Sequence, residues 1–198
     1  MLSRRTLTHG ALCGILGLLL ASTLACQNPF APNRSKRAKR EPVPATTAEN
    51  CIARLDYVMN ERDWEKYESL LDDDYWFSEP NDVDSLNFEW GKDVDIWGQE
   101  DPYVAGVKKI FEGVESFTFE FEEPQRWTEH GRDYPGEGHD AHPNEDWEVF
   151  YGFVRMLMMK PDGDGYRVDQ FMTFKLRKST GTNLWYIIRW IDDPLGAH

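Results

Sequence analysis

The sequence predicts an α+β domain in which three helices come first and a mostly antiparallel sheet follows. After residue 46, apolar residues recur at helical spacing. Phe117, Phe119 and Phe121 alternate with polar residues, which is the period of two of a half-buried strand. Two turn sequences, at 161–165 and 180–183, then separate three strand-like segments, which predicts an antiparallel meander.

The three helices are expected within residues 46–114. A capping box, with Thr46 as N-cap and Glu49 three residues later, starts the first helix, and Asp63 caps the second. The acidic run 72–74 opposes the dipole at a helix C-terminus, so the second helix is expected to end there. Asp101 followed by Pro102 is a typical start for the third. The apolar faces are Ile52, Leu55, Val58 and Met59, then Trp64, Tyr67, Leu70 and Leu71, then Tyr103, Val107, Ile110, Phe111 and Val114.

The strands are expected from residue 75 onward. Residues 75–77 and 86–90 predict a short hairpin, and Phe117 to Phe121 lie in the next strand. Three longer strands follow at 147–159, 166–178 and 184–191. In the second of these, alternate residues should share one face, namely Val168, Gln170, Met172, Phe174 and Leu176.

This order of elements resembles the nuclear transport factor 2-like superfamily, which includes the SnoaL-like proteins. The resemblance covers residues 46–193 and depends on four segments. These are residues 60–64, the pair Leu70-Leu71, residues 75–77 and the closing strand 185–192. It implies that three N-terminal helices pack on a strongly curved sheet and form a cone with an open end. Because such domains include isomerases, dehydratases, cyclases and non-catalytic binding modules, the resemblance does not decide the function.

The N-terminus predicts export. Residues 1–25 combine an early basic pair with an apolar run too short to span a bilayer, as in a signal peptide. Leu24-Ala25-Cys26 resembles a bacterial lipobox, although Thr23 stands where that motif usually has Leu, Val or Ile. The resemblance implies lipidation of Cys26 and a membrane-anchored protein of the cell envelope. Ordinary cleavage and an uncleaved anchor are the alternatives.

A disordered tether is expected at residues 26–45, and a short tail at 194–198. The tether is rich in proline and has five basic residues at 34–40, which would attract anionic lipid head groups or serve as a solvated spacer. From residue 46 onward the chain has 34 acidic and 15 basic residues. Such a charge excludes nucleic acid as a partner. Cys51 is expected to be a small buried hydrophobic residue.

The best candidate ligand contacts are two arginines on predicted strands. Arg155 is in phase with Tyr151, and Arg189 with the apolar residues of the last strand, so both are candidates for binding an anionic ligand in an aromatic pocket. The alternative is that each pairs with an acid on the other sheet face. Tyr57, Tyr67, Tyr151 and Gln170 are secondary pocket candidates, for an anionic or apolar ligand.

The loop at 130–142 contains three histidines. Imidazole and carboxylate groups are zinc ligands, and His139 and His142 are close enough in sequence to share an ion. However, the glycines and prolines of the loop oppose a preorganised site. We therefore expect a solvated polar loop, no metal and no cofactor.

Three functions are compatible with these observations. The favoured one is a non-catalytic cone domain that binds a small molecule or a partner. The second is a cofactor-independent lyase or isomerase with a pocket carboxylate as general base, for which Asp169 and Asp192 are candidates. The third is a structural module that docks or forms a homodimer through its sheet. A carboxylate deep in an apolar cone favours the enzyme, arginines there favour an anionic ligand, and a cone filled by tryptophans favours the structural role.

Overall fold

The computed structural model describes residues 41–79, 88–100, 104–133 and 136–193. The chain divides into two units, residues 1–39 and 40–198, and all described residues belong to the second. The predicted signal peptide, the lipidation site Cys26 and the tail at 194–198 lie outside the described residues. No helix of the described part is long and apolar enough to cross a membrane.

The last residues of the predicted tether are part of the folded unit. Ala45 is buried, and its carbonyl accepts a hydrogen bond of 2.8 Å from the backbone N–H of Trp185. The first helix, α2, then spans Ala48–Glu61. Its N-cap is Thr47 and not Thr46, since the Thr47 side chain accepts from the Asn50 N–H. The two threonines are adjacent, and the sequence pattern alone favoured the wrong one.

The second helix, α3, is shorter than expected and spans Trp64–Glu68. Asp63 caps it as predicted, but the chain enters strand β1 (Leu71–Glu79) at once, so the acidic run 72–74 lies in a strand. Asp72 is buried there and accepts hydrogen bonds from Arg177, and this partner offsets its burial. The predicted start of the third helix, 101–102, lies outside the described residues; helix α5 spans Val107–Gly113.

Helix α4 (Lys92–Trp97) was not predicted. It follows strand β2 (Phe88–Gly91), the second strand of the expected hairpin with β1. With six residues between two glycines, it is too short to show a helical period. The described residues therefore contain four α-helices, α2 to α5, and a short 3₁₀ helix at Gly138–Asp140.

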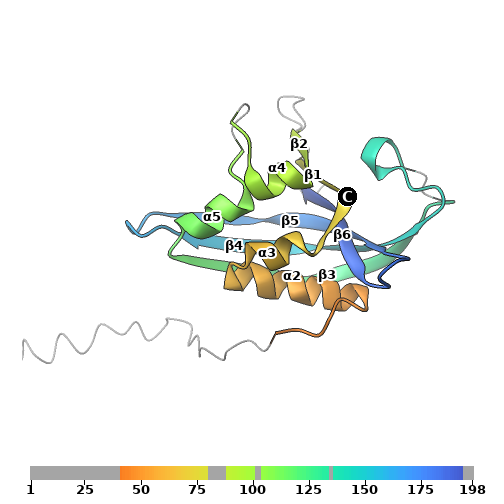
Figure 1. Cartoon of the computed structure of the whole chain (residues 1–198), viewed down its shortest axis with the longest axis horizontal. Helices are drawn as coiled ribbons and strands as arrows, with labels where there is room; N and C mark the ends of the chain where they lie inside the picture. Colours follow the sequence, from red (N-terminus) through yellow and green to blue (C-terminus); the bar gives the residue numbers. More distant parts are fainter. Residues whose placement is uncertain (1–40, 80–87, 101–103, 134–135, 194–198) are drawn as a thin grey trace, which may run out of the picture. The chain divides into compact units, whose positions relative to one another are not determined.

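Six strands form one sheet in the order β2-β1-β6-β5-β4-β3, which confirms the predicted α+β class. The last four are β3 (Ser116–His130), β4 (Asp146–Met159), β5 (Gly165–Lys178) and β6 (Trp185–Asp193). Neighbouring strands among them pair antiparallel, and β4, β5 and β6 form the predicted meander, whereas β1 and β6 are parallel. In Figure 1 these strands lie side by side, and α2 runs along β3.

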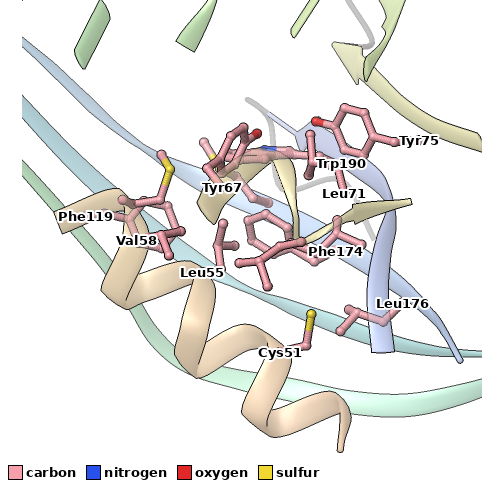
Figure 2. Packing of buried hydrophobic residues seen from close by; sticks show 14 of the residues in the cluster. Cys51, Leu55, Val58, Tyr67, Leu71, Tyr75, Phe119, Phe174, Leu176 and Trp190 are labelled. Carbon is pink, nitrogen blue, oxygen red and sulfur yellow. The ribbon is translucent and has the colours of Figure 1, made fainter. Parts of the chain in front are cut away.

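The helices cover one face of this sheet, here called the inner face. Figure 2 shows Cys51 and Leu55 of α2 directed toward Leu176 and Phe174 of the sheet, and Val58 of α2 beside Phe119. Of the expected face of β5, Met172, Phe174 and Leu176 are buried in this core. Burial raises the pKa of the Cys51 thiol to about 12, as expected for an inert packing residue.

Candidate functional site

A cavity of about 190 Å³ lies between the inner face of the sheet and the helices. We call it the inner cavity. Its walls are mostly aromatic and aliphatic side chains. The lining residues are Met59, Tyr67, Phe77, Trp90, Asp95, Val104, Ala105, Val107, Ile110, Phe111, Phe117, Met156, Met158, Met172, Trp190 and Asp192. In Figure 2, Tyr67 and Trp190 lie on the side of the core that is away from α2.

Asp95 is the buried carboxylate of this cavity. It is 7% exposed and comes from α4, which places it opposite α3 and next to β1 and β2. The Tyr67 hydroxyl donates to its Oδ2 at 2.8 Å, and the Trp90 indole N–H donates to its Oδ1 at 3.2 Å. The Tyr75 hydroxyl donates to Oδ1 at 3.5 Å. All three donors are electrically neutral.

Burial raises the pKa of Asp95 to about 6, because the charged form loses its hydration. The hydrogen bonds from Tyr67, Trp90 and Tyr75 oppose this rise, since they stabilise the carboxylate. Burial also raises the pKa values of Tyr67 and Tyr75 well above the usual range, and the Asp95 charge adds to that effect. Both phenols therefore remain neutral donors at physiological pH, while Asp95 titrates within one or two units of it.

Asp95 has no cationic partner in the part of the chain that the structure describes. None of the described residues that line the inner cavity is a lysine, arginine or histidine. A second carboxylate, Asp192, also lines it and accepts a hydrogen bond from Gln170. The cavity is thus apolar and aromatic, with acidic groups as its charged side chains.

The structure brings only some of the sequence-predicted contacts to this cavity. Tyr67 lines it, and Gln170 reaches it through Asp192. Tyr57 packs half-buried against the core, with the Lys66 ammonium 5.9 Å from its ring. Tyr151 lies on the opposite face of the sheet, where its ring stacks on Phe171 at 5.3 Å.

Arg155 also lies on the opposite, outer face. Its guanidinium forms ion pairs with Glu122 at 2.9 Å, Asp169 at 3.2 Å and Glu120 at 3.3 Å. These three carboxylates neutralise its positive charge. Tyr151 and Arg155 do share one face of β4, as expected, but it is the outer face. The inner face has the alternate residues Phe150, Val154, Met156 and Met158. Both sets are apolar enough to be buried, and so the phase alone did not identify the inner face.

Arg189 is buried under the β3–β4 loop and does not share a pocket with Arg155. Its Nη1 donates to the carbonyl oxygens of Asp74 and Ile188, and its Nε lies 3.3 Å from Asp140. Burial lowers the pKa of Arg189. The surrounding outer cleft, of about 910 Å³, is larger than the inner cavity.

The cationic groups of this outer cleft are already paired. Arg177 contacts Asp72, Asp74 and Glu145, and Lys92 lies 3.6 Å from Asp73. An anionic ligand would have to displace these acids. We therefore regard the inner cavity, which is smaller but has an uncompensated carboxylate, as the better candidate site.

Most described residues of the histidine-containing loop are exposed, as the sequence predicted, but His142 is buried. His142 is 4% exposed and stacks on Trp147 at 3.8 Å, and His139 stacks on Trp76 at 3.7 Å. Aromatic surface on the outer face thus holds the loop down. No group of three metal-ligating side chains occurs in the described ranges.

Asp95 is the residue that sequence reasoning missed. The candidates for a pocket acid were Asp169 and Asp192, which lie on long strands. Asp169 pairs with Arg155 and Arg167 on the outer face, whereas Asp192 does line the inner cavity. The available signal for Asp95 was its position between the apolar residues Val94 and Ile96, in a short segment flanked by glycines.

Comparison with solved structures finds similar domains at low sequence identity. The chain is similar to a Kribbella flavida protein, with 8% identity, 74% of this chain and 87% of that chain covered, and a TM-score of 0.50. It is also similar to a nuclear transport factor 2 (NTF2-like) superfamily protein from Salmonella enterica, with 12% identity, 75% and 92% covered, and a TM-score of 0.47.

A ketosteroid isomerase-like protein from Erwinia carotovora is similar too, with 16% identity, 77% and 97% covered, and a TM-score of 0.45. Likeness at this level concerns the fold and carries no activity from one protein to another. No protein-family model matches the sequence, and neither does any curated protein.

Proposed function

We propose that residues 46–193 form a nuclear transport factor 2-like domain whose inner cavity binds a small, mostly apolar molecule. The observation that carries the proposal is Asp95, a buried carboxylate on the wall of an otherwise apolar cavity. An apolar cavity with few convergent polar groups is the usual form of a small-molecule site, because apolar contact gives affinity and the polar groups fix orientation.

The size of the cavity limits the ligand. About 190 Å³ accommodates a single substituted ring and is slightly larger than the engineered cavities of about 150 Å³ that bind benzene. Four methionines, Met59, Met156, Met158 and Met172, form part of the wall. Their unbranched side chains adapt to differently shaped ligands, which suits a site of moderate selectivity.

Calorimetric titration with benzyl alcohol tests the binding function. The wild type is expected to bind with a Kd of about 0.1–1 mM, given the few heavy atoms of this probe. Ala105→Trp places an indole into the cavity and should abolish binding. Phe171→Leu, on the outer face, should bind as the wild type does. Binding that persists in Ala105→Trp would place the site elsewhere.

A second candidate function is general-base catalysis by Asp95 in a lyase or isomerase. The observation in its favour is the pKa of Asp95, which burial raises to about 6, near the operating range of a general base. Its carboxylate would remove a proton from the carbon next to a ligand carbonyl and return it at the same or another position. Exchange of the α-protons of cyclohexanone in D₂O, faster with wild type than with Asp95→Asn, would support this function.

On the sequence alone, we also propose that the domain is exported and anchored through lipidated Cys26. The apolar segment before Cys26 and the basic residues of the tether support this proposal. Homodimerisation through the outer face, where Phe171 is 39% exposed, stays a further proposal. Sedimentation of the wild type and Phe171→Glu would test it.

A further inference from the structure

The charge of the inner cavity limits what can occupy it. Two carboxylates, Asp95 and Asp192, are among its lining residues, and the described lining has no basic side chain. An anionic ligand would be placed near two acids, of which Asp95 is buried. Coulomb repulsion is strong there because the effective dielectric constant is low. The cavity therefore disfavours carboxylate and phosphate ligands.

Asp95 has hydrogen bonds but no counter-charge. Its donors are the neutral groups of Tyr67, Tyr75 and Trp90. Among the described residues, burial and the hydrogen bonds from Tyr67, Trp90 and Tyr75 cause the shift of its pKa, and no cationic side chain contributes. A buried carboxylate without a cationic partner keeps much of its desolvation penalty. A positive charge delivered by a ligand would offset that penalty.

The aromatic residues of the wall favour the same type of ligand. Trp90, which donates to Asp95, stacks on Phe77 with ring centroids 4.1 Å apart, and both rings line the cavity. Trp190 also lines the cavity, and its ring centroid lies 6.2 Å from that of Phe77. Ring faces attract organic cations through their quadrupoles, most strongly in tryptophan and away from water. A carboxylate next to such rings is suited to an ammonium group attached to an apolar body.

Building on the binding function proposed above, we propose that the ligand of the inner cavity is a small amine, whose protonated nitrogen pairs with the Asp95 carboxylate and whose apolar body fills the aromatic and methionine-lined space. An ammonium at Asp95 also lowers the affinity of this carboxyl for a proton. The amine ligand therefore accords with binding and not with general-base catalysis.

Calorimetry with three probes of one shape tests the amine preference. Benzylamine, benzyl alcohol and benzoate share a ring and differ in charge. At pH 7.5 the full chain should bind benzylamine about tenfold more tightly than benzyl alcohol, and benzoate most weakly. Asp95→Asn should remove the preference for the amine but retain the alcohol. Asp169→Asn, in the outer-face ion pairs, should keep the wild-type order.

The pH dependence of the wild type gives a second measurement that needs no variant. Benzylamine binding should weaken as the pH falls from 7.5 to 5, because Asp95 becomes protonated, while benzyl alcohol binding should not. Equal affinity for amine and alcohol, or a preference that survives in Asp95→Asn, would overturn the amine proposal alone. If none of the three probes binds, both the amine proposal and the binding function fail.

Discussion

The side-chain amide of Asn60 pairs with both backbone groups of Phe119. Its Oδ1 accepts from the Phe119 N–H at 3.1 Å, and its Nδ2 donates to the Phe119 carbonyl oxygen at 2.8 Å. Phe119 lies on β3, the edge strand of the sheet, while Asn60 lies near the end of α2. The amide thus occupies the place that another strand would take, which satisfies and protects this edge. The same contact fixes α2 over the inner face.

Asn60→Ala should therefore destabilise the protein by about 2–3 kcal/mol, because it leaves two backbone groups of a buried residue without partners. Urea unfolding measures this free energy. Asn50→Ala is the matched control on the same helix, since Asn50 makes an exposed hydrogen bond with Thr46. If both variants lose the same free energy of unfolding, the hydrogen bonds between Asn60 and Phe119 stabilise the protein no more than an exposed hydrogen bond does.

Gly106 should resist substitution because it joins the α4 region to α5. A Cβ at this position would lie 2.4 Å from the Ile96 carbonyl oxygen and 2.4 Å from the Gly98 nitrogen. Gly106→Ala should cost about 1–3 kcal/mol through overpacking and should weaken benzyl alcohol binding, since Val107, Ile110 and Phe111 line the cavity.

Gly113→Ala, at the other end of α5, provides the comparison. A Cβ there would meet nothing within 4 Å, so the variant should be neutral or more stable by up to about 1 kcal/mol. Thermal unfolding of the two variants checks both expectations. A Gly106→Ala protein as stable as Gly113→Ala would contradict the packing of this junction.

Asp95 should make stability depend on pH. Its folded pKa of about 6 exceeds the ordinary 3.8, so its contribution is fully present below pH 3.8 and is lost as the pH rises through 6. At about 1.4 kcal/mol per pKa unit, the free energy of unfolding should fall by about 3 kcal/mol over this range relative to Asp95→Asn. Tyr67 and Tyr75, which face Asp95, do not titrate there. If the free energies of unfolding of the wild type and Asp95→Asn vary with pH in the same way, Asp95 has no raised pKa in the folded protein.

The proposed anchor has a simple test in cells. Cys26→Ser removes the thiol that the lipid would modify, so the protein should move from the membrane fraction to the soluble fraction. Fractionation followed by immunoblotting measures the change. A Cys26→Ser protein that stays wholly in the membrane fraction would exclude the lipid anchor.

Much of the fold could be predicted because its signals are local. The Asp63 cap, the alternation around Phe119 and the turn at 161–165 each depend on a few neighbouring residues, and the helix α3, the strand β3 and the β4–β5 hairpin follow from them. The position of residues 72–74 was predicted wrongly. Their negative charge indicates that a helix should end nearby, but it does not indicate that the chain continues as a strand through these residues. There a distant residue, Arg177, decides the outcome.

The candidate site was harder to predict because long-range packing creates it. Strand β4 is apolar on both faces, so only the position of the helices makes Met156 inner and Arg155 outer. Asp95 lies on a helix of six residues, and two of its hydrogen-bond donors, Tyr67 and Tyr75, are 28 and 20 positions away in sequence. Such a juxtaposition leaves no periodic pattern in a single sequence.

The most direct test of the inner cavity is an NMR titration of the Asp95 side-chain carboxyl carbon, assigned with Asp95→Asn and recorded with and without saturating benzylamine. In the free protein this carboxyl should titrate with a pKa of about 6. Bound benzylamine should lower that pKa by about one unit or more, because an ammonium next to a buried carboxylate favours its charged form. A free-protein pKa near 3.8 that benzylamine leaves unchanged would contradict both the buried carboxylate and its proposed ligand.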